Sequence, residues 1–145
     1  MRSLVLAVSI FFSLANADFI RNDKEHVVTD SATQMMWQDN DDTTSIRLSW
    51  EKSLSHCEAY EFGGYTDWRL PTKQELLTIV DGTKKDIKIN AAFKNISSYV
   101  YWSSSKPKGG LPLAWRVDFD DAKAHWGARK FAFLVRCVRD AEVSE

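Results

Sequence analysis

The side chains with the most specific chemistry are two cysteines. Cys57 and Cys137 are the only cysteines among 145 residues. Two thiols form one disulfide or act together as a redox pair, and reactive thiols need an accessible, polar surrounding. The two residues form no CxxC motif. Cys57 falls at helical spacing with the apolar Trp50 and Leu54, and Cys137 lies in a largely apolar predicted strand. We therefore expect a structural disulfide, with thiol chemistry as the alternative.

The first 17 residues favour the disulfide because they have the layout of a secretory signal peptide. Arg2 precedes an apolar stretch from Leu4 to Leu14, and Ala15-Asn16-Ala17 has the small-x-small pattern of a cleavage site. The stretch is shorter than the roughly 20 residues that span a bilayer. We expect residues 1–17 to be removed and the mature protein, without a transmembrane segment, to be periplasmic or secreted. A buried N-terminal helix is the alternative.

No group of side chains has the spacing of a metal or catalytic site. His26, His56 and His125 are scattered, which predicts no zinc site. The acidic segment 39–42 lacks the glycine and the glutamate of an EF-hand, so we interpret it as a solvated loop. Residues 103–114 contain no Asp, Glu, Asn or Gln, which argues against calcium-dependent sugar binding. The sequence predicts no catalytic residue, no metal and no cofactor.

Basic side chains gather in the C-terminal part, where residues 101–139 hold eight basic and three acidic residues. Cations beside an aromatic ring suit sulfated or carboxylated sugars. The candidate ligand-binding residues are Lys106, Lys108, Arg116, Lys123, His125, Trp126, Arg129 and Lys130. Because Asp118, Asp120 and Asp121 are interleaved, ordinary solubilising charge is the alternative. The net charge of -1 argues against nucleic-acid binding.

Apolar periodicity predicts one α+β domain after the first 17 residues. Helices are expected from Ser49 to about Phe62 and from Thr72 to Asp81-Gly82. Strands are expected at 26–30, 33–38, 100–104, 114–119, 122–126 and 133–139, with a tight turn at Asp120-Asp121. Residues 18–26 are predicted to be a flexible arm and 141–145 an acidic tail.

The clearest local signal is a capping box, with Thr72 as N-cap and Glu75 three residues later. It follows the segment Asp67, Trp68, Arg69, Leu70 and Pro71. We interpret Trp68 and Leu70 as core and Asp67 and Arg69 as turn residues. A binding edge with exposed charge beside an aromatic ring is the alternative.

These motifs, in this order, resemble the Lcl C-terminal domain family, which is named for the C-terminal domain of a collagen-like adhesin of Legionella. The resemblance covers about residues 27–140. The segments that carry it are 28–33 with 36–38, 50–57, 64–72 with 75–76, 101–104, 114–119 and 135–139. Members often have Gly where this chain has Gln34, which puts the turn geometry there in doubt.

The resemblance implies a C-type-lectin-like fold related to formylglycine-generating enzymes, with two helices flanking small twisted antiparallel sheets. It also implies an exported bacterial protein, and the name-giving adhesin is associated with sulfated glycosaminoglycans. The first hypothesis is a non-catalytic recognition module for an acidic polysaccharide or an envelope or host protein. An enzyme of the formylglycine-generating kind, or its accessory, and a structural part of an envelope assembly are the alternatives, because fold does not fix function.

Overall fold

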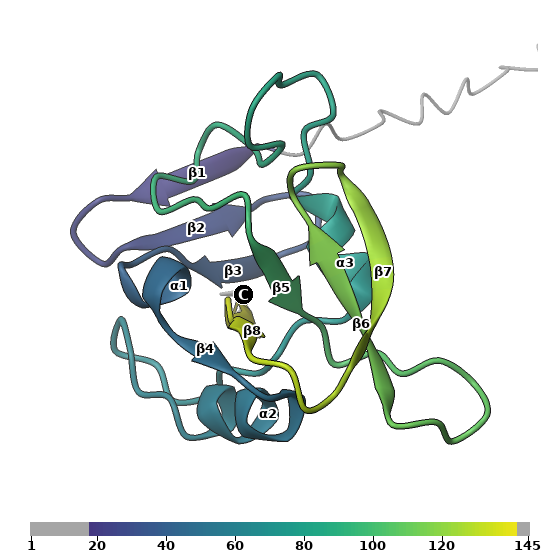
Figure 1. The fold of residues 1–145 in the computed structure, drawn as a ribbon. Helices are drawn as coiled ribbons and strands as arrows, with labels where there is room; N and C mark the ends of the chain where they lie inside the picture. Colours follow the sequence, from purple (N-terminus) through teal and green to yellow (C-terminus); the bar gives the residue numbers. More distant parts are fainter. Residues whose placement is uncertain (1–17, 142–145) are drawn as a thin grey trace, which may run out of the picture.

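Two small sheets and three short helices make up residues 18–141, the part of the chain that the computed structural model describes (Figure 1). The first sheet is antiparallel throughout and has the order β1-β2-β3-β9. Its strands are β1 (Phe19–Asn22), β2 (Val27–Asp30), β3 (Met35–Gln38) and β9 (Val138–Asp140). The β2–β3 hairpin confirms the predicted pairing. Its turn places Gln34 at φ +59°, in the region that favours glycine.

Strand β1 replaces the flexible arm that the sequence predicted over residues 18–26, so that prediction was wrong. Its register with β2 runs from Phe19↔Asp30 to Asn22↔Val27. Two side chains hold it in place. Phe19 packs against the core, and the Arg21 guanidinium lies 2.7 Å from a buried carboxylate of Asp39. The predicted leader, residues 1–17, and residues 142–145 of the predicted tail lie outside the described part.

The second sheet has the order β4-β8-β5-β6-β7. Its strands are β4 (Arg47–Leu48), β5 (Val100–Trp102), β6 (Leu113–Asp118), β7 (Lys123–Ala128) and β8 (Phe133–Leu134). All pairings are antiparallel except β5 with β8. The β6–β7 hairpin turns at residues 119–122, which confirms the predicted turn. Before β6, the chain from 105 to 112 projects away from both sheets (Figure 1).

The last predicted strand, residues 133–139, is two strands in two different sheets. β8 pairs with β4 and β5, whereas β9 pairs with β3. Between them, Arg136 donates to the carbonyl oxygen of Gln38 at 2.7 Å, and the backbone N–H of Cys137 donates to the Gln38 side chain at 3.0 Å. These contacts replace ladder hydrogen bonds, so the strand breaks where the chain passes between the sheets.

The helices are α1 (Asp42–Ser45), α2 (Trp50–Glu58) and α3 (Lys73–Thr78). α2 begins after Ser49 as predicted but ends before the predicted Phe62, because Tyr60 donates from its hydroxyl to Asp42 at 2.7 Å and Phe62 bridges to Tyr65. α3 has the predicted capping box and ends at Thr78, short of Asp81-Gly82.

A disulfide joins Cys57 of α2 to Cys137, next to β9, with a Cα–Cα distance of 5.6 Å. Both cysteines are fully buried, in a cluster with Trp50, Trp68 and Trp102. A second buried cluster lies between α3 and the two sheets. The structure thus confirms the predicted α+β class with small sheets, few helices and one disulfide.

Candidate functional site

A groove with basic and aromatic lining lies at the start of α3, beside the β6–β7 hairpin. It has a volume of about 690 Å³. The residues that line it, here called the lysine–tryptophan groove, are Lys73, Gln74, Ser105, Lys106, Pro107, Lys108, Trp115 and Trp126. All of them lie in the described part of the chain, and none is acidic. Three of the candidate residues, Lys106, Lys108 and Trp126, are among them.

The two tryptophans are directly opposed across β6 and β7. Trp115 pairs with Trp126 in the ladder, and the ring centroids are 5.3 Å apart at an angle of 60°. Lys73 lies over the Trp115 ring, with its Nζ 4.0 Å from the centroid. Trp115 is thereby held, whereas the Trp126 side chain is 57% exposed. Trp126 therefore presents an aromatic surface to the groove, whose lining also contains the three lysines.

Hydrogen bonds fix one end of the lysine-bearing loop against α3. The backbone N–H of Ser104 donates to the carbonyl oxygen of Pro71 at 2.8 Å. The N–H of Lys73 donates to Oγ of Ser105 at 2.9 Å, and the N–H of Trp115 donates to the carbonyl oxygen of Ser105 at 2.9 Å. The groove is therefore built at a junction between α3, β6 and the start of the loop.

The other candidate residues do not belong to the groove, so the predicted single basic face is divided. Neighbouring residues of a strand point to opposite faces of a sheet. Arg116 and His125, which pair with each other, accordingly lie on the face opposite the Trp115–Trp126 pair. Lys123, two residues from His125 along β7, shares that face and is exposed.

Arg116 is committed to packing on that opposite face. Its guanidinium lies 5.3 Å from the ring centroid of Phe133, and its Nε is buried without a hydrogen-bond partner among the described residues. Arg129 is committed too: it donates from Nε to the carbonyl oxygen of Leu113 at 3.0 Å and lies over the Trp50 ring. Lys130 is exposed beside Phe131.

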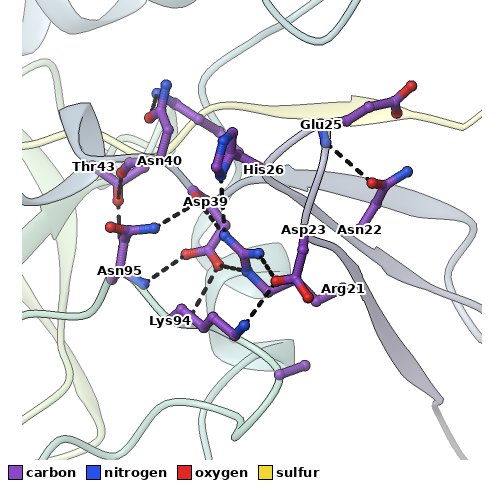
Figure 2. Close-up of polar contacts among 12 residues, drawn as sticks. Arg21, Asn22, Asp23, Glu25, His26, Asp39, Asn40, Thr43, Lys94 and Asn95 are labelled. Atoms are coloured by element: carbon purple, nitrogen blue, oxygen red, sulfur yellow. Dashed lines mark hydrogen bonds and ion pairs between the residues drawn. The ribbon is translucent and has the colours of Figure 1, made fainter.

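A second polar cluster surrounds Asp39 (Figure 2), and some of its members, among them Arg21, Lys94 and Asn95, line a cleft of about 430 Å³. The Asp39 side chain is fully buried, which corrects the interpretation of segment 39–42 as a solvated loop. The carboxylate accepts hydrogen bonds from the backbone N–H groups of Lys94 (2.9 Å) and Asn95 (3.1 Å). It also accepts from Arg21 at 2.7 Å and from Arg136, itself fully buried, at 3.1 Å.

Because these donors come from β1, the loop after residue 90 and the segment between β8 and β9, Asp39 ties three distant parts of the chain together. The groups that donate to the Asp39 carboxylate are satisfied within the cluster, although the buried Nε of Arg136 has no hydrogen-bond partner among the described residues. We therefore assign this cluster a structural role.

A comparison with protein-family models shows which family the chain belongs to. The model of the Lcl C-terminal domain matches residues 26–139. The chain belongs to this family. A comparison with curated proteins gave no match. None of the helices within residues 18–141 has the length and apolar character needed to cross a membrane.

In this Lcl C-terminal domain the segment from Asp67 to Glu75 contributes to packing and to ion pairs. Trp68 and Leu70 are buried, with 2% and 3% of their surfaces exposed. Asp67 accepts from Arg139 of β9 at 2.6 and 3.1 Å, and this contact lowers the pKa of Asp67 below its ordinary 3.8. Arg69 donates to both carboxylate oxygens of Glu75, at 2.6 and 2.8 Å.

One cluster of potential ligand atoms escaped the sequence reasoning, which treated the histidines separately. Asp118, Asp121 and His125 place their ligand atoms within 4.8 Å of one another at the β6–β7 turn. Nε2 of His125 lies 2.6 Å from Oδ2 of Asp121. Partial burial alone would raise the pKa of Asp121, but the contacts with His125 and the Lys123 N–H outweigh it and lower the pKa. The contact between the His125 ring and the Asp121 carboxylate explains why these ligand atoms lie close together.

The residues that sequence reasoning missed at the groove are Lys73, Gln74 and Trp115. In the sequence, Lys73 and Gln74 lie in the capping-box segment and Trp115 lies in a predicted strand, and neither context indicates a ligand site. No sequence signal places the start of α3 beside β6, because that contact joins residues about forty positions apart.

Proposed function

We propose that this Lcl C-terminal domain is an exported, non-catalytic recognition module that binds an acidic glycan in the lysine–tryptophan groove without calcium. The single observation that carries the proposal is the exposed Trp126 ring, seated against Trp115 in a groove with three lysines and no acidic residue. An aromatic ring supplies an apolar surface for the carbon–hydrogen face of a sugar. Lysines beside it attract carboxylate or sulfate groups.

The lining chemistry supports a calcium-independent mode. Ca²⁺ takes six to eight oxygen ligands, with carboxylates prominent among them. The groove offers no carboxylate, so charge pairing with lysine replaces metal bridging. The ammonium groups of Lys106 and Lys108 are exposed and lie on one loop, where they reach a polyanion without first breaking a salt bridge within the described residues.

The disulfide supports a non-catalytic role over the enzyme alternative. Chemistry of the formylglycine-generating kind needs redox-available thiols. Cys57 and Cys137 are the only cysteines of the chain, and both are fully buried and bonded to each other. The bridge instead makes the domain a rigid support for the groove.

Retention on immobilised heparin, eluted with a salt gradient, tests the proposal. We expect Lys106→Glu/Lys108→Glu to elute at much lower salt than the wild type, because two contacts of up to ~1 kcal/mol each are lost, or about 10- to 30-fold in affinity. The matched control is Lys123→Glu/Lys130→Glu, which makes the same charge change at exposed positions outside the groove.

Trp126→Ala tests the aromatic half of the site. It should weaken binding at every salt concentration while the slope of affinity against salt stays the same, because no charge is removed. The proposal fails if the wild type is not retained at low salt, or if the groove double variant and the control double variant elute together.

A further inference from the structure

The loop that carries Lys106 and Lys108 is held only at its two ends. Ser105 is fixed by the bonds to Lys73 and Trp115 described above, and the carbonyl oxygen of Pro112 accepts from the N–H of Arg129 at 3.1 Å. Within residues 18–141, no hydrogen bond joins residues 106–110 to any other residue. The loop therefore has fixed hinges and an untethered middle.

The middle of this loop contains the two residues best able to change conformation. Gly109 and Gly110 have φ values of +105° and +67°, and a Cβ added at either would meet no atom within 4 Å. Glycine populates positive and negative φ about equally, so the loop can rearrange at low conformational cost. No neighbouring atom lies close enough to these two glycines to obstruct such a change.

An apolar side chain follows the glycine pair. Leu111 is 57% exposed, although leucine is stabilised by burial. After it the chain re-enters the sheet at Leu113, which shares the face of Trp115 because the two are two residues apart on β6. The loop thus starts at the groove, where its two lysines belong to the lining, then exposes its leucine, and returns on the face that bears the tryptophan pair.

We propose that residues 106–111 form a clasp that closes over a glycan bound on Trp126 and brings Leu111 against it. This inference rests on the proposed function for the place of the ligand. When the loop closes, Leu111 is buried between the glycan and the protein, and Lys106 and Lys108 stay close to the anionic groups of the glycan. Leu111 is then a ligand-contacting residue that acts on dissociation, because the open loop leaves the groove accessible to an arriving chain.

Binding kinetics with a size-defined heparin octasaccharide test the clasp on the disulfide-bonded protein. We expect Leu111→Ser to dissociate about tenfold faster with an unchanged association rate, because the charges remain and only apolar burial is lost. Gly109→Ala/Gly110→Ala, which restricts the middle of the loop at positive φ, should also shorten the lifetime of the complex. Leu77→Ser is the matched control, since Leu77 is an exposed leucine of α3 outside the groove lining.

The outcomes separate the two proposals. If the wild type does not bind the octasaccharide, the proposed function fails and the clasp with it. If the wild type binds and Trp126→Ala weakens binding, but Leu111→Ser and the double alanine variant dissociate like the wild type, the clasp alone is wrong.

Limited trypsin digestion gives a second readout of closure. The Lys108–Gly109 bond lies in the untethered part of the loop and should be cut in the free protein, whereas a bond before proline, such as Lys106–Pro107, resists trypsin. Saturating octasaccharide should slow this cut about tenfold or more in the wild type and clearly less in Leu111→Ser. Equal protection in both proteins would mean that the ligand simply covers Lys108, and would overturn the clasp.

Discussion

Replacing Asp39 with alanine should be among the most destabilising changes in this domain, although the residue lies in a polar segment. The change removes the carboxylate that faces the buried Arg136 at 3.1 Å. Breaking a buried ion pair by removing one partner costs about 3–5 kcal/mol, because the remaining charge is buried without compensation. Arg136 keeps the carbonyl oxygens of Gln38 (2.7 Å) and Asn95 (2.5 Å) as acceptors, which places the cost in the lower half of that range.

The two backbone N–H groups that Asp39 accepts, from Lys94 and Asn95, also lose their partner, which adds to the cost. We therefore expect a loss of about 4–5 kcal/mol in the free energy of unfolding, a large part of the 5–15 kcal/mol typical of a domain. Urea unfolding followed by tryptophan fluorescence, with the disulfide intact, measures it.

Asp41→Ala is the matched control, because Asp41 is exposed in the same segment and makes no side-chain capping bond. It should change stability by no more than about 0.5 kcal/mol. In the double variant Asp39→Ala/Arg136→Met, the loss should be smaller than the sum of the single losses, because the unpaired charge is removed as well. A cost of less than about 1 kcal/mol for Asp39→Ala would refute the buried ion pair.

Three further changes test other features. Cys57→Ser/Cys137→Ser should lose about 4.5 kcal/mol of unfolding free energy in the chain-entropy model, as measured by urea unfolding. A loss under about 1 kcal/mol would argue against a disulfide that joins residues 80 positions apart. Gln34→Gly should stabilise the protein by up to about 1 kcal/mol in thermal unfolding, because φ is +59° at this position. A lower melting temperature would show that the hydrogen bond from the Gln34 side chain to Ser31 contributes more to stability than the relief of backbone strain. The bond from Arg139 lowers the pKa of Asp67, so its stabilisation is present above pH 3.8 and is lost as the pH falls through the folded-state pKa. Asp67→Asn should therefore show a smaller drop in urea midpoint than the wild type between pH 6 and pH 3, and equal drops would contradict the assignment.

Local signals in the sequence predicted local structure well. The capping box at Thr72 and Glu75 is confirmed because both of its hydrogen bonds lie within four residues of chain. The β2–β3 hairpin and the turn after β6 are confirmed for the same reason. In each case neighbouring residues supply the whole interaction.

Long-range contacts account for the failures. Strand β1 could not be recognised because its pairing with β2 and the bond from Arg21 to Asp39 are set by tertiary structure. Asp39 looked solvated because its basic partner, Arg136, lies almost a hundred residues away. Polarity alone does not distinguish an exposed loop from a satisfied buried cluster.

The division of the predicted basic face could have been predicted from the sequence, because successive side chains of a strand alternate between its two faces. His125 and Trp126 are adjacent in one strand and therefore face opposite ways. The groove itself could not be predicted, because Lys73 reaches Trp115 only through packing of α3 against β6.

The passage of residues 133–140 from one sheet to the other has a consequence for biogenesis. Neither sheet is complete until this stretch has been synthesised, because β8 lies between β4 and β5 and β9 pairs with β3. Cys57 emerges 80 residues before Cys137, so its thiol has no partner until the last strands are made. The fold is therefore sealed late, by one short stretch that delivers the missing strands and the second sulfur at the same time.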